Sequence, residues 1–299
     1  MKKILGLLIT GLVFNIGVAQ NYQTDFQKYF QANDTTNQLK TLIEWEKSNP
    51  KDAELFTSYF NYYFNKSKNE ILVVAAGDPP KEEEYLSLSD SAGNYTGFIG
   101  SQINYNNSYL KKGLDKITDG INLYPNRLDM RFGKIYVLGQ VKDWNSFTKE
   151  IIKTIDYSAI NDNQWTWTNN EKQKNGKDFF LSSLQDYQVQ LYNTGNDDLL
   201  VNMREIANEV LKFYPNHIES LSNLSVTYLL TGEYDKGLDP LLKAEKVNPK
   251  DYIVLSNIAQ GYKLKGDKKK AIEYYKKTIE YGDEQAKTYA KQQIDELKK

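Results

Sequence analysis

The sequence predicts an all-α chain built from stacked helical hairpins, and two observations carry this prediction. A short proline turn recurs four times, as NPKD at residues 49–52 and 248–251 and as YPN at residues 124–126 and 214–216. Pro215 and Pro249 stand 34 residues apart, and the segments that follow them align with one another. A period of this length is typical of repeats in which each unit buries its apolar face against its neighbours.

The chain begins with a segment that has the three parts of a secretory signal peptide. Lys2 and Lys3 precede an apolar stretch, and small residues at Gly17 and Ala19 suit a cleavage before Gln20. The apolar stretch is short for a membrane anchor, which needs roughly 20 residues. We therefore expect residues 1–19 to be removed and no stable membrane insertion to follow.

Further hairpins are expected before the aligned pair. The segment around Leu42 and Trp45 forms a helix before Pro50, and apolar residues after it match the core positions of the repeat. The segment after Pro125 also fits, with Lys142–Trp144 in the place of a hairpin turn. About six hairpins are expected in all, followed by a charged helix from Glu284 that caps the array.

Two segments are too long for the repeat. Residues 66–107 contain two β-like runs, Ile71–Ala75 and Tyr85–Ser89, joined by a Gly-Asp-Pro-Pro turn. Residues 159–176 are predicted to form an aromatic loop between two halves of the array. The expected organisation is therefore a signal peptide (1–19), an N-terminal half with the insert (20–158), the junction loop (159–176) and a C-terminal half (177–299).

The aligned pair shares apolar, small and glycine positions. Leu221, Leu224 and Tyr228 recur at i, i+3 and i+7, which places them on one helical face and predicts that they are core residues. The aligned glycines are expected to end the first helix of each hairpin. The matching positions are Leu221 and Leu255, Asn223 and Asn257, Leu224 and Ile258, Ser225 and Ala259, Tyr228 and Tyr262, and Gly232 and Gly266.

Helix starts follow each proline turn. Asp52 and Asp251 are expected to be N-caps, because a carboxylate there accepts a hydrogen bond from the free backbone amides. Asn216 and Glu219 form a pair that resembles a capping box. Each proline turn is therefore the joint between one hairpin and the next.

The pattern resembles the tetratricopeptide repeat (TPR) family. Leu255, Ile258-Ala259, Tyr262, Ala271 and Tyr275 fit the family motif closely, whereas Gly237 and Asp283 depart from it. The resemblance implies a helical-hairpin solenoid whose first helices line a binding groove. It places the groove residues at Ser222, Asn223, Val226, Ser256, Asn257, Gln260 and Lys263.

The composition of the chain indicates where the protein acts and which class of partner is not expected. The chain has no cysteine, which excludes disulfides, thiolate chemistry and a lipid anchor at the cleavage site. A formal net charge of −1 gives no reason to expect nucleic acid as a partner. We expect a periplasmic location, with release to the exterior as the alternative.

The sequence gives weaker support to the other candidate sites. Trp165 and Trp167 alternate with polar residues, so they form a sugar-binding platform, a protein-binding hot spot or a plug between the two halves, and the plug is favoured. His217, the one histidine, is interpreted as a surface turn residue, and Glu82–Glu84 as a solvated acidic run rather than a metal site. The segments Asp34-Thr35-Thr36 and Asp90-Ser91-Ala92 resemble O-glycan acceptor motifs.

Three functions remain open from the sequence. The favoured one is a non-enzymatic scaffold, without a cofactor, that binds a protein or peptide in the groove. The second is a glycan-binding accessory protein that uses Trp165 and Trp167. The third is an enzyme acting through the inserts, which would require two buried acids close together in a pocket.

Overall fold

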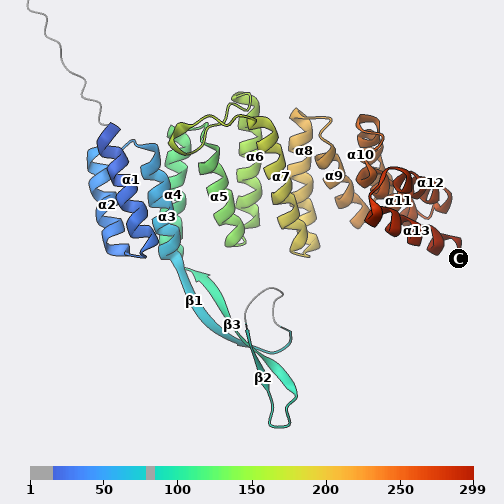
Figure 1. Ribbon diagram of the computed structural model, residues 1–299, viewed down its shortest axis with the longest axis horizontal. Helices are drawn as coiled ribbons and strands as arrows, with labels where there is room; N and C mark the ends of the chain where they lie inside the picture. Colours follow the sequence, from blue (N-terminus) through green and yellow to red (C-terminus); the bar gives the residue numbers. More distant parts are fainter. Residues whose placement is uncertain (1–15, 79–84) are drawn as a thin grey trace, which may run out of the picture. The chain divides into compact units, whose positions relative to one another are not determined.

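The computed structural model describes residues 16–78 and 85–299 (Figure 1). Those residues form 13 α-helices and one small β-sheet, so the predicted class, a TPR-type array of helical hairpins with a β insert, is confirmed. Most of the expected signal peptide and the run Glu82–Glu84 lie outside the described residues. Among the described helices, none combines the length and the apolar character needed to cross a bilayer.

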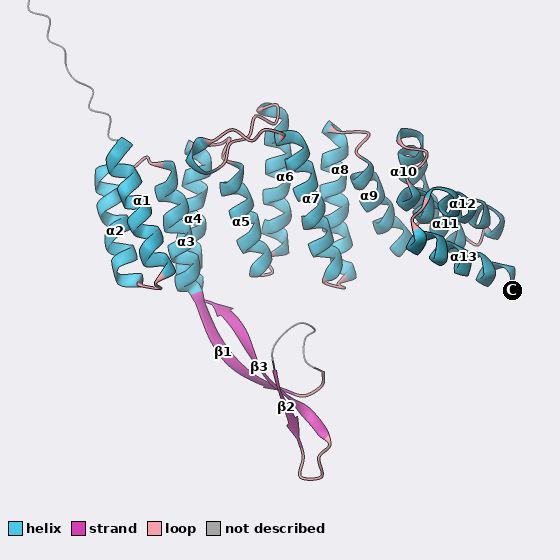
Figure 2. Ribbon diagram, in the orientation of Figure 1, coloured by secondary structure: helices cyan, strands magenta, loops and turns pink. Residues whose placement is uncertain are grey.

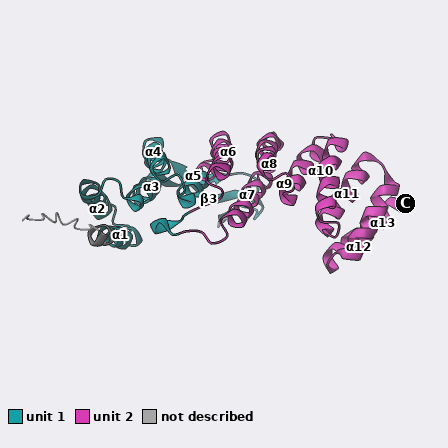
Figure 3. Cartoon of the chain, turned by 90° about the horizontal axis from the view of Figure 1, so that it is seen from above, with its two compact units in different colours: residues 1–137, 166–171 teal, residues 138–165, 172–299 magenta. Residues whose placement is uncertain are grey.

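The chain divides into two compact units (Figure 3). Unit 1 comprises residues 1–137 and 166–171, and unit 2 comprises residues 138–165 and 172–299. The sequence placed the junction at residues 159–176. In the structure the division falls within helix α5 (Leu128–Gln140), and part of the junction loop groups with unit 1.

Unit 1 contains two hairpins, the inserted sheet and most of α5. Its core includes Leu42, Trp45 and Leu55, each at most 1% exposed. The NPKD joint behaves as expected, because the Asp52 carboxylate accepts the backbone N–H of Glu54. The helices are α1 (Ile16–Gln31), α2 (Thr35–Ser48), α3 (Ala53–Ser67) and α4 (Asn107–Leu123).

The insert is a three-stranded antiparallel sheet between α3 and α4, in the order β1-β3-β2 (Figure 2). The strands are β1 (Lys68–Ala75), β2 (Tyr85–Ser89) and β3 (Tyr95–Tyr105). The first two match the predicted runs, whereas β3 was missed because glycine, serine and amide residues interrupt its alternation. The backbone N–H of Asn106 donates to the Ser67 carbonyl at 2.7 Å and closes the insert at its base.

Unit 2 contains the end of α5 and three further hairpins with a final helix. Its C-terminal core is built from repeat positions, with Leu255, Ile258, Ala271 and Tyr275 fully buried. Asp251 caps α11 through the backbone amides of Ile253 and Val254. The helices are α6 (Trp144–Ile160), α7 (Gly176–Asn193), α8 (Leu200–Phe213), α9 (Ile218–Leu230), α10 (Tyr234–Val247), α11 (Tyr252–Lys265), α12 (Lys268–Tyr281) and α13 (Glu284–Lys298).

Four hairpin turns share one hydrogen-bond pattern. In the α11/α12 turn, the N–H of Gly266 donates to the Lys263 carbonyl, and the N–H of Asp267 donates to the Tyr262 carbonyl. This pair of hydrogen bonds requires a left-handed backbone at the residue whose N–H makes the first of them, which we call the turn residue. The turn residues are Asn33 in α1/α2, Lys142 in α5/α6, Gly232 in α9/α10 and Gly266 in α11/α12.

The predicted register of α9 is wrong by part of a turn. Leu221 is buried as expected, but Leu224 and Tyr228 are half-buried, and Leu229 is buried instead. The cause lies in α10, where Gly237 stands in the place of Ala271. A Cβ at Gly237 would come within 2.7 Å of the Leu229 side chain, so the missing methyl group leaves the space that Leu229 fills.

The predicted start of α9 is also wrong by one residue. His217, not Asn216, occupies the N-cap position, and its side chain makes no capping hydrogen bond to the helix. Its Nδ1 lies 2.9 Å from the Ser220 hydroxyl, and its Nε2 lies 3.2 Å from a Glu219 carboxylate oxygen. Burial lowers the pKa of this imidazole, so it is a partly enclosed group rather than a free surface one.

Candidate functional site

The predicted groove residues lie on the first helices of the last two hairpins in unit 2. Ser222, Asn223 and Val226 on α9 are half-buried, and so are Ser256 and Asn257 on α11. They lie on adjacent first helices, because α9 contacts both α7 and α11.

Several of these residues are already held by the protein itself. The Asn223 amide donates to Gln185 on α7 at 2.7 Å. Gln260 accepts a hydrogen bond from the Tyr275 hydroxyl at 2.9 Å. Lys263 forms an ion pair with Glu296 on α13 at 3.0 Å. A ligand at these three positions would have to compete with an existing partner.

Trp165 does not offer a platform for a sugar. Its side chain is 1% exposed, and its ring lies 5.4 Å from that of Phe180 and 5.9 Å from that of Tyr157, measured between ring centroids. Gly176 lies close beside it, since a Cβ there would approach the indole to 3.4 Å. Trp165 is therefore a packing residue of unit 2.

Trp167 belongs to unit 1 and is half-buried. Its ring meets that of Phe132 edge-on at a centroid distance of 6.3 Å. The neighbouring backbone is fixed to the start of α5, because Thr166 accepts from Leu128 and donates to Asn126. The two tryptophans therefore lie in different surroundings, and the pair of exposed parallel rings that a sugar platform would need is not formed.

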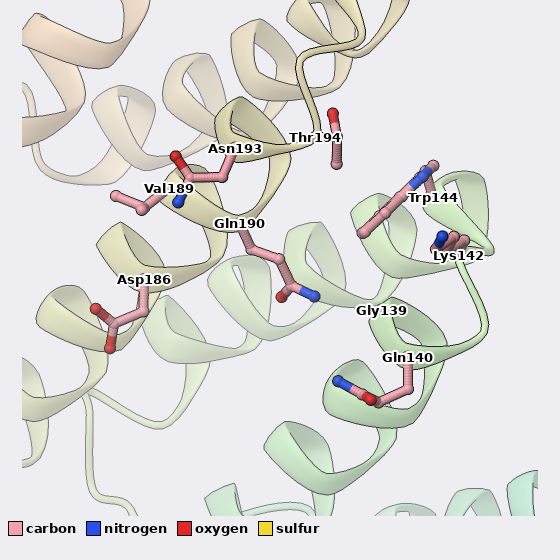
Figure 4. Close-up of a pocket in the computed structure, with 9 residues that line it drawn as sticks. All are labelled: Gly139, Gln140, Lys142, Trp144, Asp186, Val189, Gln190, Asn193 and Thr194. Atoms are coloured by element: carbon pink, nitrogen blue, oxygen red, sulfur yellow. The ribbon is translucent and has the colours of Figure 1, made fainter. Parts of the chain in front are cut away.

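The strongest candidate site is a hollow in unit 2 that the sequence did not single out (Figure 4). Its volume is about 630 Å³, and it lies between the end of α5, the α5/α6 turn and one face of α7. We call it the α5/α7 hollow. It is lined by Gly139, Gln140, Lys142, Trp144, Asp186, Val189, Gln190, Asn193 and Thr194.

A missing side chain opens this hollow. Gly139 accepts the turn hydrogen bond of its hairpin, and the same position in the other hairpins carries Phe30, Leu229 or Lys263. A Cβ at Gly139 would lie 2.7 Å from Gln190 Nε2, so glycine is what lets the Gln190 amide lie over the end of α5.

The polar groups around the hollow lack internal partners. Within the described residues, no hydrogen bond or ion pair engages the side chains of Gln140, Lys142, Asp186, Gln190 or Asn193. Figure 4 shows Lys142 and Trp144 on one wall and Asp186 on the opposite wall, with Gln190 between them. The hollow therefore presents a cation, an anion and three amides, each able to bond to a ligand.

The wall of the hollow also has apolar surface. Val189 is 43% exposed, and the Trp144 ring is half-buried against Phe147 at a centroid distance of 5.4 Å. On α7, residues 186, 189, 190 and 193 recur at helical spacing, so they share one face. Two amides, Gln190 and Asn193, with apolar surface beside them suit an extended polypeptide, whose backbone needs both donors and acceptors.

A second hollow, of about 300 Å³, lies in unit 1 between α1, α3 and α5. Behind it Arg127, 1% exposed, donates to Glu54 at 2.6 and 3.2 Å and to Asp129 at 2.8 and 2.7 Å. Burial alone would lower the pKa of Arg127, but the bonds to the two carboxylates outweigh it and raise that pKa. The backbone N–H of Asn169 also donates to Glu54, so this cluster joins α3, α5 and the junction loop.

This cluster bears directly on the enzyme hypothesis, because Glu54 and Asp129 are buried acids in one pocket. Each carboxylate places both oxygens on the Arg127 guanidinium, so both acids are engaged in one ion-pair cluster. The arrangement is one that holds helices together. It gives no support to acid–base catalysis.

A further pair of acids lies in unit 2. Burial, followed by a hydrogen bond with Glu209, raises the pKa of Asp156, and Lys212 lies 2.7 Å from the Glu209 carboxylate. Neither acid lines the α5/α7 hollow or the hollow in unit 1. Within residues 16–78 and 85–299, no group of three or more histidine or acidic side chains is arranged to hold a metal ion.

Comparison with known proteins gives limited matches. No family model matches the chain. The BBSome complex member BBS4 of Bos taurus is 40% identical over 82 residues, and that of Mus musculus is 38% identical over 82 residues. Those residues are 27% of this chain, and the chain spans about 15% of the length of these curated relatives.

Solved structures with similar helices have low sequence identity. YrrB, described as a TPR protein with an unusual peptide-binding site, gives a TM-score of 0.41 at 14% identity, covering 84% of this chain and 97% of that chain. A structure of MamA gives 0.38 at 13% identity, covering 60% and 92%. The TPR domain of P58(IPK) gives 0.32 at 11% identity, covering 94% and 65%.

Proposed function

We propose that this chain is a non-enzymatic scaffold that binds an extended segment of a partner protein in the α5/α7 hollow. The observation that carries the proposal is the set of five polar side chains around the hollow that have no partner within the described residues. Elsewhere in unit 2, comparable groups such as Asn223, Gln260 and Lys263 are bonded to the protein itself. Unpaired amides beside apolar surface gain hydrogen bonds and bury area when a peptide docks.

The bound segment continues from the hollow along the first helices towards Asn223 and Asn257. Both side chains are half-buried on adjacent helices. The Asn223 amide already donates one hydrogen bond to Gln185, so its oxygen and its second N–H are what it offers to a ligand, whereas the Asn257 amide can donate and accept at once. In this proposal the hollow fixes the position of the peptide, and the two asparagines extend the contact.

Site-specific photocrosslinking tests the proposal. A benzoylphenylalanine at Val189, which is 43% exposed in the hollow, is expected to capture a defined partner from the cellular fraction in which the chain resides. The matched control is the same residue at Val201 on α8, which is 55% exposed and does not line the hollow. Equal crosslinking at both positions would show that the hollow is not the docking site.

Two double variants then distinguish binding in the hollow from binding over α9 and α11. Gln190→Ala with Asn193→Ala removes amides from the hollow, and Asn223→Ala with Asn257→Ala removes the extension. Each lost hydrogen bond is expected to weaken partner binding by about 1 kcal/mol. If only the second pair weakens binding, the partner sits over α9 and α11 and not in the hollow.

We also propose that the chain acts in the periplasm after export. The basic start, the apolar stretch and the small residues before Gln20 support this. The expected mature mass is that of residues 20–299 in a periplasmic extract. Intact protein with Met1 attached, found only in the cytoplasmic fraction, would contradict export.

A further inference from the structure

The turn residue of the α5/α6 hairpin is unlike its counterparts. In all four matched turns the backbone is left-handed, with φ of 53°, 58°, 78° and 87°. Gly232 and Gly266 adopt this conformation without strain, and Asn33 tolerates it because asparagine visits the left-handed region more readily than most residues. Lys142 has neither advantage, so the chain keeps a lysine where glycine would be more stable.

The strain at Lys142 is not compensated by contacts within the protein. Its ammonium forms no ion pair or hydrogen bond within the described part of the chain, and its side chain is exposed. The nearest carboxylate in sequence, that of Asp143, is occupied because it accepts the backbone N–H of Ser146 at 3.1 Å. A strained residue that gains nothing for folding is a candidate for a role in binding.

The side chain of Lys142 is also placed for binding. It lines the α5/α7 hollow beside Trp144, on the wall that faces Asp186 (Figure 4). The other polar groups of that wall are neutral, so Lys142 is the positive charge of the hollow. A ligand that crosses from one wall to the other meets a cation at the turn and an anion on α7.

We propose that Lys142 selects a partner segment with an acidic side chain at the α5/α6 end of the hollow. This inference rests on the proposed peptide-binding function and names the chemistry that the site prefers. A glutamate or aspartate there pairs with the ammonium, and its neighbouring backbone reaches the amides of Gln140 and Gln190. The strained lysine is retained because the ion pair with the ligand requires a side chain that glycine lacks.

The test uses paired peptides with the mature chain. An array of N-acetylated, C-amidated nonapeptides carries a central glutamate or a central glutamine on otherwise identical sequences, and the best binders are measured by fluorescence anisotropy. The wild-type chain is expected to favour the glutamate peptide by about three- to fivefold, the range of a solvent-exposed ion pair.

The decisive variant is Lys142→Gly, which should separate stability from binding. It is expected to raise the melting temperature, because glycine relieves the left-handed strain, and to remove the preference for glutamate. Asn33→Gly is the matched control at the same turn position of the α1/α2 hairpin, and it should leave the preference unchanged.

Three results would overturn the inference. A glutamate preference that survives Lys142→Gly assigns the selectivity to another group. Binding of both peptides with equal affinity by the wild-type chain overturns the role of Lys142 and leaves the groove function standing. Absence of binding by any peptide in the array overturns the groove function and the inference together.

Discussion

The two hollows of this protein contain similar residue types but use them in opposite ways. In unit 1, the Arg127 guanidinium bonds to Glu54 and Asp129, and the three side chains are 1%, 10% and 13% exposed. In unit 2, Lys142 and Asp186 lie on opposite walls and have no partner within the described chain. Charges that satisfy each other stabilise the fold, whereas charges left unpaired are available to a ligand.

The largest expected effect would come from breaking the unit 1 cluster. Arg127→Met should lower the free energy of unfolding by about 3–5 kcal/mol, because two buried carboxylates lose their counter-charge. Urea denaturation followed by circular dichroism measures the loss. The control is Lys111→Met, whose pair with Asp115 has side chains 75% and 59% exposed, so its effect should be below about 0.5 kcal/mol. Equal losses would mean that the cluster is not a structural element.

Filling the unit 2 hollow should affect binding more than folding. Gly139→Ala places a Cβ 2.7 Å from Gln190 Nε2 and 3.2 Å from the Phe147 ring, and the flexible amide must move out of the hollow. The gain in helix propensity of about 1 kcal/mol offsets the strain, so we expect stability to change by no more than about 1 kcal/mol. Peptide binding should fall. Unchanged affinity would place the ligand elsewhere.

Removing polar groups from the hollow should leave stability nearly unchanged. The single variants Gln190→Ala and Asn193→Ala are expected to shift the free energy of unfolding by less than about 0.5 kcal/mol, since neither amide is bonded within the protein. Thermal and urea melts measure this directly. A loss of more than 1 kcal/mol would reveal that these amides stabilise the fold after all, and the contrast between the two hollows would disappear.

The smallest expected effect is that of salt, which should weaken the interactions of the exposed Lys142 more than those of the buried Arg127. Raising the ionic strength from about 0.01 to 0.15 M shortens the Debye length from about 30 to 8 Å, so binding of an acidic peptide at the exposed Lys142 should weaken. The stability difference between the wild-type chain and Arg127→Met should stay nearly constant, because buried pairs are screened much less. Parallel titrations of affinity and of unfolding at several salt concentrations measure both.

Much of the fold could be predicted because its signals are local. The proline joints, the caps at Asp52 and Asp251 and the glycines at the turns each act within a few residues. The register of α9 could not be predicted in the same way, since it depends on a methyl group missing from Gly237 on the next helix. Strand β3 was not predicted because its residues do not alternate clearly between polar and apolar types.

The candidate sites were harder to predict because they join distant residues. Arg127 meets Glu54 across 73 positions, and no periodicity relates them. The α5/α7 hollow combines a hairpin turn with a helix that follows an irregular loop, so the 34-residue alignment does not reach it. The available signal was a lysine at a turn position where the aligned hairpins have glycine, beside a glycine where they have larger residues.

The base of the β insert has a consequence for the order in which unit 1 folds. Every matched hairpin turn joins its helices through a few residues, but α3 and α4 must meet across the whole segment from Lys68 to Tyr105. Closing a longer loop costs more chain entropy, and strand pairing that proceeds from the β-turns towards the Ser67–Asn106 hydrogen bond brings the two ends together progressively. We therefore expect the strands to pair before α4 docks on α3, because their pairing shortens the loop that remains to be closed.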